Sequence, residues 1–172
     1  MKNITLLIFF LLSASTTVLG QIPTNCFEIE SILVDACGNP ENGNEMVRFK
    51  VGPTALDASN MVVDWPNNNW LGLIQDANTA TTTADLNATI TSCGYLKEPT
   101  SYILPAGANV LLITSQFVSI SANSFANLTD TLYVLYQDLP VPTSTGHFSN
   151  SATTPRTLII DFTAPASCGD TV

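Results

Sequence analysis

Apolar residues that alternate along the chain are the feature that most limits its fold. In "EMVRFKV", Val47, Phe49 and Val51 alternate with residues suited to an exposed face, and "TLIIDF" repeats the alternation. Successive side chains of a β-strand point to opposite faces, so each of these segments has one face for a core and one for solvent. The period of two predicts strands and argues against amphipathic helices at both places.

Three other runs are apolar on both faces. They are "FEIESILVDA", "NVLLIT" and "TLYVLYQ", which are rich in β-branched and aromatic residues and bounded by Pro, Gly, Asn or Asp. Such runs predict central strands. The polar stretch "QDANTATTTADLNATITSC" is expected to be a connection, and only "SISANSFANL" is expected to form a short helix. We therefore predict an all-β fold, an antiparallel β-sandwich of about seven to nine strands.

The first twenty residues have the organisation of an export signal. Lys2 is followed by an apolar run over residues 6–12 and then by small polar residues that end at Gly20. That order predicts a signal peptide over residues 1–20, with cleavage after Gly20. The apolar run is far shorter than the roughly 20 residues that span a bilayer. We expect residues 21–172 to form a single secreted domain that is not inserted in a membrane.

The charge of the chain excludes one class of partner. It has 14 acidic and 5 basic residues, a net charge of −9. Binding to nucleic acid depends on clustered Lys and Arg, which this chain lacks, so no nucleic-acid partner is expected. An acidic balance suits solubility and cation binding.

A polar loop separates the first two predicted strands. Its Asn42-Gly43 step tolerates positive φ and is a strong signal for chain reversal, so the loop is expected to close a hairpin. A calcium site is the alternative, with Asp35, Glu41 and Glu45 as carboxylate ligands, because Ca²⁺ takes roughly six to eight oxygen ligands. The spacing of an EF-hand is absent.

No residue pattern indicates catalysis. His147 is the one histidine, and no nucleophile-elbow sequence accompanies it. We expect a loop histidine hydrogen-bonded to backbone. Glycoside hydrolysis needs two carboxylates across a cleft, and the sequence selects no pair. The chain is therefore not expected to be an enzyme or to carry a cofactor.

Two tryptophans are candidates for a ligand platform. Trp65 and Trp70 bracket the segment "PNNN", and a pair of exposed indole rings would suit a sugar. In the more common arrangement one or both rings close the open end of the sandwich, because large aromatic side chains are mostly buried in part.

Several segments, taken in order, resemble a known family. "IESILVDA", a polar loop, "NEMVRFKVG", "ALDASNMVV" and "ILPAGANVLLITS" are similar to the lamin-tail domain, an immunoglobulin-like sandwich. The residues that match its motifs are Glu30, Glu45, Leu56, Asp57, Pro105 and Gly107. With "WPNNNWLGL" and "SFANLTDTLYVLY" added, the chain also resembles the N-terminal region of large secreted proteins of gliding Gram-negative bacteria. Those proteins continue into further domains and end in a sorting domain for type IX secretion.

The resemblance implies a non-catalytic module. Its expected role is cell-surface organisation or adhesion, through a protein or glycan partner outside the cell or on its surface, and the chain is either a stand-alone version or the N-terminal part of a longer protein. The alternative is a carbohydrate-binding module associated with a secreted hydrolase, with Trp65 and Trp70 as its platform.

Four cysteines outside the signal predict two disulfides in an oxidising compartment. An extended strand holds Cys26 and Cys37 roughly 30 Å apart, whereas a disulfide needs Cα atoms within about 7 Å. If the strand over residues 157–168 runs antiparallel beside the first, Cys26 pairs with Cys168 and Cys37 with Cys93. A pairing of Cys26 with Cys93 is the alternative if it does not.

Overall fold

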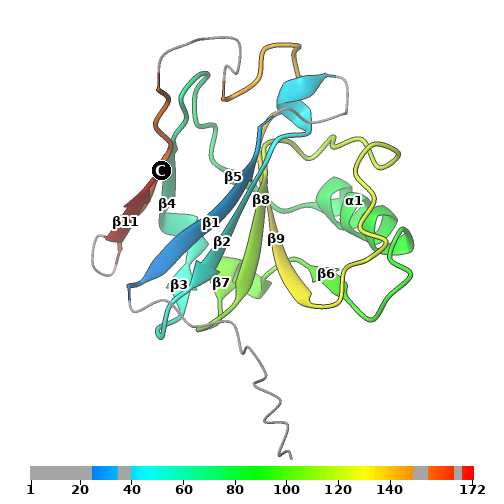
Figure 1. Cartoon of the computed structure of the whole chain (residues 1–172), viewed down its shortest axis with the longest axis horizontal. Coiled ribbons are helices and arrows are strands. Elements are labelled where there is room, and N and C mark those ends of the chain that lie inside the picture. Colours follow the sequence, from blue (N-terminus) through cyan, green and yellow to red (C-terminus); the bar gives the residue numbers. More distant parts are fainter. Residues whose placement is uncertain (1–24, 35–39, 149–154, 165–167) are drawn as a thin grey trace, which may run out of the picture.

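The computed structural model describes residues 25–34, 40–148, 155–164 and 168–172, which form a β-rich fold in three layers (Figure 1). A six-stranded sheet lies in the middle, a smaller sheet covers one face, and one helix covers part of the other. The predicted signal peptide over residues 1–20 lies outside the described residues. Within the described ranges no helix is long and apolar enough to cross a membrane.

The central sheet has the order β1-β2-β8-β9-β5, and β6 also pairs with β9. Its strands are β1 (Phe27–Leu33), β2 (Met46–Val51), β8 (Asn109–Ile113), β9 (Thr131–Gln137), β5 (Leu73–Ile74) and β6 (Tyr95–Lys97). The smaller sheet has the order β11-β10-β4, from β11 (Cys168–Thr171), β10 (Ile159–Phe162) and β4 (Met61–Asp64). A separate pair joins β3 (Leu56–Asp57) to β7 (Ile103–Leu104). The other elements are helix α1 (Ala77–Ala88) and the 3-10 turns η1 (Glu41–Gly43), η2 (Ala58–Asn60) and η3 (Thr100–Tyr102).

The prediction of a purely antiparallel sandwich is wrong in the central sheet. β9 runs parallel to both β8 and β6, whereas β1–β2, β2–β8 and β5–β9 are antiparallel. Parallel neighbours need a crossover, and residues 114–130 make it by crossing the face of the sheet. The described residues contain eleven strands where about seven to nine were expected. The excess comes from pieces as short as two residues, which leave no periodic pattern.

Two apolar cores explain the two kinds of strand pattern. The larger core lies between the sheets and contains Val47, Phe49 and Val51, as predicted, together with buried residues of β4 and β10. A second core on the other face packs Leu111 and Val134 of the central strands against α1 and the crossover. β8 and β9 are buried on both faces and read as continuous apolar runs, as predicted. The prediction of a central strand is wrong for β1, which is the edge strand of the sheet and has exposed residues along one face. The second core also buries Met46, and Lys50 is buried too, although both were expected on a solvent-exposed face.

The helix lies in the stretch expected to be a connection. Asp76 caps α1 by accepting from the Asn78 and Thr79 backbone N–H groups at 2.8 and 3.0 Å, and the Thr79 hydroxyl accepts from the Asp76 N–H at 2.9 Å. This capping box supplies the start signal. Thr79, Thr83 and Leu86 then form one buried face, so packing against the sheet stabilises a threonine-rich segment whose intrinsic helix propensity is low.

The helix expected over "SISANSFANL" is absent, and these described residues form turns. The Asn44 side-chain oxygen accepts from the Ser119 backbone N–H at 2.8 Å and from the Asn123 amide at 2.9 Å. Bonds from a distant side chain thus fix an irregular path, in place of the local bonds of a helix.

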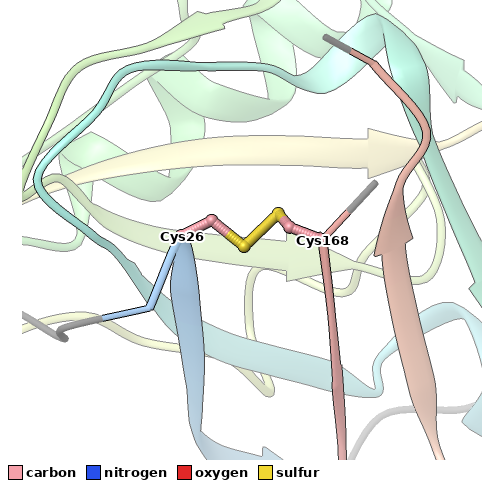
Figure 2. The surroundings of a disulfide bond; sticks show 2 residues. All are labelled: Cys26 and Cys168. Atoms are coloured by element: carbon pink, nitrogen blue, oxygen red, sulfur yellow. A yellow bond between two sulfur atoms is a disulfide. The ribbon is translucent and has the colours of Figure 1, made fainter. Parts of the chain in front are cut away.

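A disulfide joins the edges of the two sheets. Cys26, before β1, is bonded to Cys168 at the start of β11, with 6.3 Å between their Cα atoms (Figure 2). The Ile29 N–H of β1 also donates to the Asp170 carboxylate at 2.7 Å. The predicted pair is confirmed, but its reason needs correction. The strand expected beside β1 is β10, whereas the actual neighbour is β11, which pairs with β10 in the smaller sheet.

The second predicted disulfide stays a prediction. Cys93 is exposed and has no disulfide partner in the described part of the chain, and its Sγ donates to the Thr129 carbonyl at 3.5 Å. Cys37 lies outside the described residues. β6, which follows Cys93 in sequence, begins beside Thr131. This end of the central sheet is opposite to the end where β1 finishes at Leu33.

The Tyr136 hydroxyl connects the central sheet to α1. It lies 2.9 Å from the Thr83 hydroxyl in the second core. Burial raises the pKa of Tyr136 far above its usual value, because an ionised phenolate would lose its hydration there. The folded state therefore disfavours ionisation of this side chain, and the unfolded state does not.

This difference predicts a loss of stability at alkaline pH. Because the folded pKa is the higher one, the contribution of Tyr136 is complete below about pH 10 and falls above it by at most about 1.4 kcal/mol per pH unit. Urea unfolding at pH 8 and pH 11 should show a smaller alkaline loss for Tyr136→Phe than for the unmodified chain. Tyr95→Phe, at a tyrosine 55% exposed, serves as the control and should behave as the unmodified chain. Equal alkaline losses for all three proteins would contradict the assignment.

Candidate functional site

Three segments meet at the end of the central sheet where β2 begins and β9 ends. We call them the loop end: residues 40–45, residues 66–72 and residues 139–148 (Figure 1). The Asn67 N–H donates to the His147 carbonyl at 2.7 Å, and the Asn42 N–H lies 3.4 Å from the Thr143 carbonyl oxygen. Segments far apart in sequence are thus bonded to each other directly.

A chain of four buried polar side chains lies beneath the loop end. The Glu45 Oε2 atom is 3.1 Å from His147 Nδ1, and His147 Nε2 is 2.9 Å from Gln137 Nε2. The Trp65 indole N–H donates to Gln137 Oε1 at 2.8 Å. The Gln137 amide nitrogen also donates to the Thr114 carbonyl at 3.2 Å. These four hydrogen-bonded side chains, which we call the buried chain, therefore connect the starts and ends of several strands across the interior.

One proton arrangement satisfies every member of this buried chain. The Trp65 indole can only donate, so the Gln137 oxygen must face it and the Gln137 nitrogen must face His147. His147 Nε2 is then the acceptor, which places the ring proton on Nδ1, pointing at Glu45. The tautomer is assigned from the hydrogen-bond network. In this arrangement each polar group has a complementary partner.

Glu45 is a buried carboxylate held by donors from one loop. Its side chain is fully buried, and it accepts from the His147 backbone N–H at 2.6 Å, from the His147 ring, and from the Phe148 N–H at 3.4 Å. A buried charge is tolerated when several donors surround it. Glu45 therefore fixes residues 147 and 148 over the start of β2.

Asparagine side chains fasten the rest of the loop. Asn42 donates to the Thr143 hydroxyl at 3.0 Å and accepts from the Thr143 N–H at 2.5 Å. Asn67 and Asn68 both donate to the Gly146 carbonyl, at 2.8 and 3.1 Å. Hydrogen bonds to the other two segments of the loop end thus anchor residues 143–148 at several points.

The predicted tryptophan platform is corrected by these contacts. Trp65 is 5% exposed, and its ring meets those of His147 and Phe148 at centroid distances of 5.0 and 5.6 Å. Trp70 is half-buried, 6.3 Å from Trp65. Trp65 therefore closes the end of the sandwich and offers no ring face to a ligand, and only Trp70 remains partly accessible.

The candidate calcium ligands are not assembled in the described residues. The Glu45 oxygens accept from three N–H groups, which leaves them less available to a cation, and the calcium site stays a prediction. Asp35 and the side chain of Glu41 lie outside what the structure describes. Among the described side chains no group of three His, Cys, Asp or Glu residues is arranged to hold a metal. The hairpin prediction is confirmed, because β1 and β2 pair antiparallel on either side of the loop, but its reason needs correction: Asn42 and Gly43 lie in the 3-10 turn η1, and neither has a positive φ.

His147 differs from its prediction as well. Its backbone is hydrogen-bonded, as expected. Its side chain, however, is buried, with 1% of its surface exposed, and the ring hydrogen-bonds to the side chains of Glu45 and Gln137 and not to backbone. Gln137 is the member of the buried chain that sequence reasoning missed. The available signal was its position, because Gln137 is a polar residue that directly ends a dense apolar strand.

The loop end encloses a small cavity of about 200 Å³. Its walls are mostly amide and hydroxyl side chains with one leucine from each long loop: Asn42, Asn68, Asn69, Leu71, Leu139 and Thr143, and the nearly buried His147 also lines it. Amides supply both donors and acceptors. The cavity can therefore hydrogen-bond a polar group while the leucines contact an apolar one.

Comparison with protein-family models, with curated proteins and with solved structures finds no match to this chain. The geometry itself defines a β-rich fold that carries a disulfide and a closed, polar loop end. Disulfides persist mainly in oxidising environments such as the cell exterior.

Proposed function

We propose that the chain is a secreted, non-catalytic module for cell-surface organisation or adhesion, which binds a protein or glycan through its loop end. The observation that carries the proposal is the buried chain from Glu45 to Trp65. Its ionisable groups, Glu45 and His147, are sealed from solvent and bonded to protein partners. In this proposal Glu45 and His147 stabilise the conformation of the loop end and do not act on a substrate.

A surface fixed in advance is suited to binding. Association costs less when loops need no further ordering. The loop end also presents apolar side chains to solvent, because Leu71 is 48% and Val141 72% exposed. Amides of Asn68 and Asn69 lie beside Leu71 in the same cavity wall. An apolar centre with polar neighbours is the composition expected of a protein–protein or protein–glycan contact.

The finer assignment belongs to the same proposal. We infer an immunoglobulin-like, lamin-tail relationship and export by the type IX route from the motif resemblance. Two sheets packed around a shared core support it. The carbohydrate-binding alternative that used both tryptophans loses support because Trp65 is buried.

The proposal is tested by binding of the fluorescently labelled mature chain, residues 21–172, to intact cells of the organism that produces it. Leu71→Asp introduces a charge into the loop end and should weaken saturable binding at least about tenfold, as at an interface hot spot. Val62→Asp is the matched control, because Val62 is 47% exposed on β4 in the smaller sheet. It should bind as the unmodified chain does.

Two results would contradict this function. One is the absence of saturable binding by the unmodified chain to cells or to their isolated surface fraction. The other is equal binding by Leu71→Asp and Val62→Asp, which would remove the loop end as the contact surface.

A further inference from the structure

A second and larger cavity lies between α1 and β6. It has a volume of about 650 Å³ and shares no lining residue with the loop-end cavity. One wall comes from the first half of α1 and the residues before it, and the other from β6 and η3. The lining includes Gln75, Asp76, Tyr95, Glu98, Thr100 and Ser101. We call it the α1–β6 cavity.

Glu98 is held in one orientation in this cavity. Its Oε1 atom accepts from the Thr83 hydroxyl at 3.1 Å, and its Oε2 atom lies 3.1 Å from the Thr79 hydroxyl, whose single proton is shared with the Asp76 carbonyl at 3.0 Å. Since the single hydroxyl proton of Thr83 points at Glu98, the Tyr136 hydroxyl donates to Thr83. The carboxylate is thus positioned from the core outward, and lone pairs remain for a further donor.

Gln75 is an exposed side chain oriented by one hydrogen bond. Its amide nitrogen donates to the Pro99 carbonyl at 3.1 Å. No bond from the described residues reaches its Oε1 atom, which is left as an acceptor. The cavity therefore contains a carboxylate held by α1 and an amide oxygen that can accept from a ligand.

The free edge of β6 is closed to another strand. Asn87 of α1 donates to the Leu96 carbonyl and accepts from the Leu96 N–H, both at 2.8 Å. These two bonds occupy the backbone groups that an added peptide strand would need. A ligand at this cavity must therefore be recognised through side chains.

Two further features belong to the cavity or its border. Tyr95 lines it and is 55% exposed, so part of its ring can contact a ligand. Ser101 in the wall and its neighbour Tyr102 adopt left-handed backbone conformations, with φ of 51° and 60°. Such conformations cost energy in non-glycine residues and concentrate at binding sites.

We propose that the α1–β6 cavity binds a saccharide of one or two sugar units. Sugar hydroxyls can donate to the oxygens of Glu98 and Gln75 and accept from the Thr100 and Ser101 hydroxyls, while the Tyr95 ring contacts the apolar face of the sugar. The volume lies within the range of small-ligand sites. Lys97 also lines the cavity, with its ammonium 4.5 Å from the centroid of the Tyr133 ring, and Ala80 and Leu96 add apolar wall. Two carboxylates, Asp76 and Glu98, against one ammonium favour a neutral ligand over a phosphorylated one, and the mixed polar and apolar walls suit a ligand with both kinds of surface.

This inference goes beyond the proposed function, because it places a different ligand contact on different residues. The first measurement is a glycan array probed with the mature chain, residues 21–172, followed by calorimetric titration of the mono- or disaccharide that binds. Tyr95→Ala and Gln75→Ala should each weaken that binding at least about tenfold. Their controls are Phe117→Ala, at an exposed aromatic outside the cavity, and Asp85→Asn, at an exposed site on α1. Both controls should bind as the unmodified chain does.

Three outcomes would overturn the inference. The first is that no array sugar binds, even at millimolar concentration. The second is that Tyr95→Ala and Gln75→Ala bind the sugar with unchanged affinity. The third is that the control variants lose as much sugar affinity as these two variants do. Leu71→Asp at the loop end should leave the sugar affinity unchanged. Sugar binding can therefore fail while cell binding through the loop end persists, and the reverse result is equally distinguishable.

Discussion

Replacing both Cys26 and Cys168 with alanine is expected to lower the free energy of unfolding by about 5 kcal/mol. The bridge joins residues 142 positions apart, and cross-linking so long a loop strongly restricts the unfolded chain in the chain-entropy treatment. The double variant also frees the edge of β1 from β11, whose contact would then depend on the bond from Ile29 to Asp170. Urea unfolding followed by tryptophan fluorescence measures the change.

The control for this prediction changes exposed residues on the same two strands. Ser31→Ala combined with Thr171→Ala should stay within about 1 kcal/mol of the unmodified chain, since both side chains are exposed. A loss of less than about 1 kcal/mol in the double cysteine variant would contradict the stabilising role of the bridge. A comparable loss in Cys93→Ala alone would support the predicted second disulfide with Cys37.

Glu45→Ala is expected to cost about 3 to 5 kcal/mol, the cost of removing one partner from a buried charged network. The substitution leaves the His147 and Phe148 N–H groups and the His147 ring proton buried without an acceptor. Each unsatisfied buried group carries its full desolvation penalty. Chemical denaturation at neutral pH gives the free energy difference directly.

Glu28→Ala is the matched control for Glu45→Ala. Glu28 is an exposed carboxylate on β1, the strand that pairs with β2. Its replacement should change stability by no more than about 0.5 kcal/mol. If both variants were equally stable, the buried chain beneath the loop end would have no structural importance.

The strands that form the larger core could be predicted because their alternation survives in the sequence. Leu158, Ile160 and Phe162 are all buried, as expected from "TLIIDF". What the alternation could not show is a third layer. Met46 was expected on a solvent-exposed face from the local alternation, and it is buried in the second core with residues of α1 and the crossover, which meet it only in the folded chain.

The helix was missed because local propensity and tertiary packing disagree. Four threonines in α1 favour extended structure, while the buried faces of Thr79, Thr83 and Leu86 stabilise the helix. The spacing of Asp76 and Thr79 was the available signal, as a capping box. Alternation of apolar and polar residues, which predicted the strands, does not detect a capping box.

The site was harder to predict than the fold. Glu45 and His147 stand 102 positions apart, and Trp65 and Gln137 stand 72 apart. No spacing rule connects such residues, because their contact follows from the order of the strands. That Trp65 closes the end of the sandwich agrees with the more common arrangement of large aromatic rings. Its hydrogen-bond partner, however, depends on where β9 ends.

We infer that the linked side chains of Glu45, His147, Gln137 and Trp65 hold the loop end in one arrangement before any partner binds. Amide hydrogen exchange of the mature chain without ligand tests it most directly. The His147 and Phe148 amides should exchange at least about a thousandfold more slowly than an unstructured peptide, comparable to the core amides of β9. Exchange of these two amides within about tenfold of the unstructured rate would show that the loop end opens freely and would contradict the account.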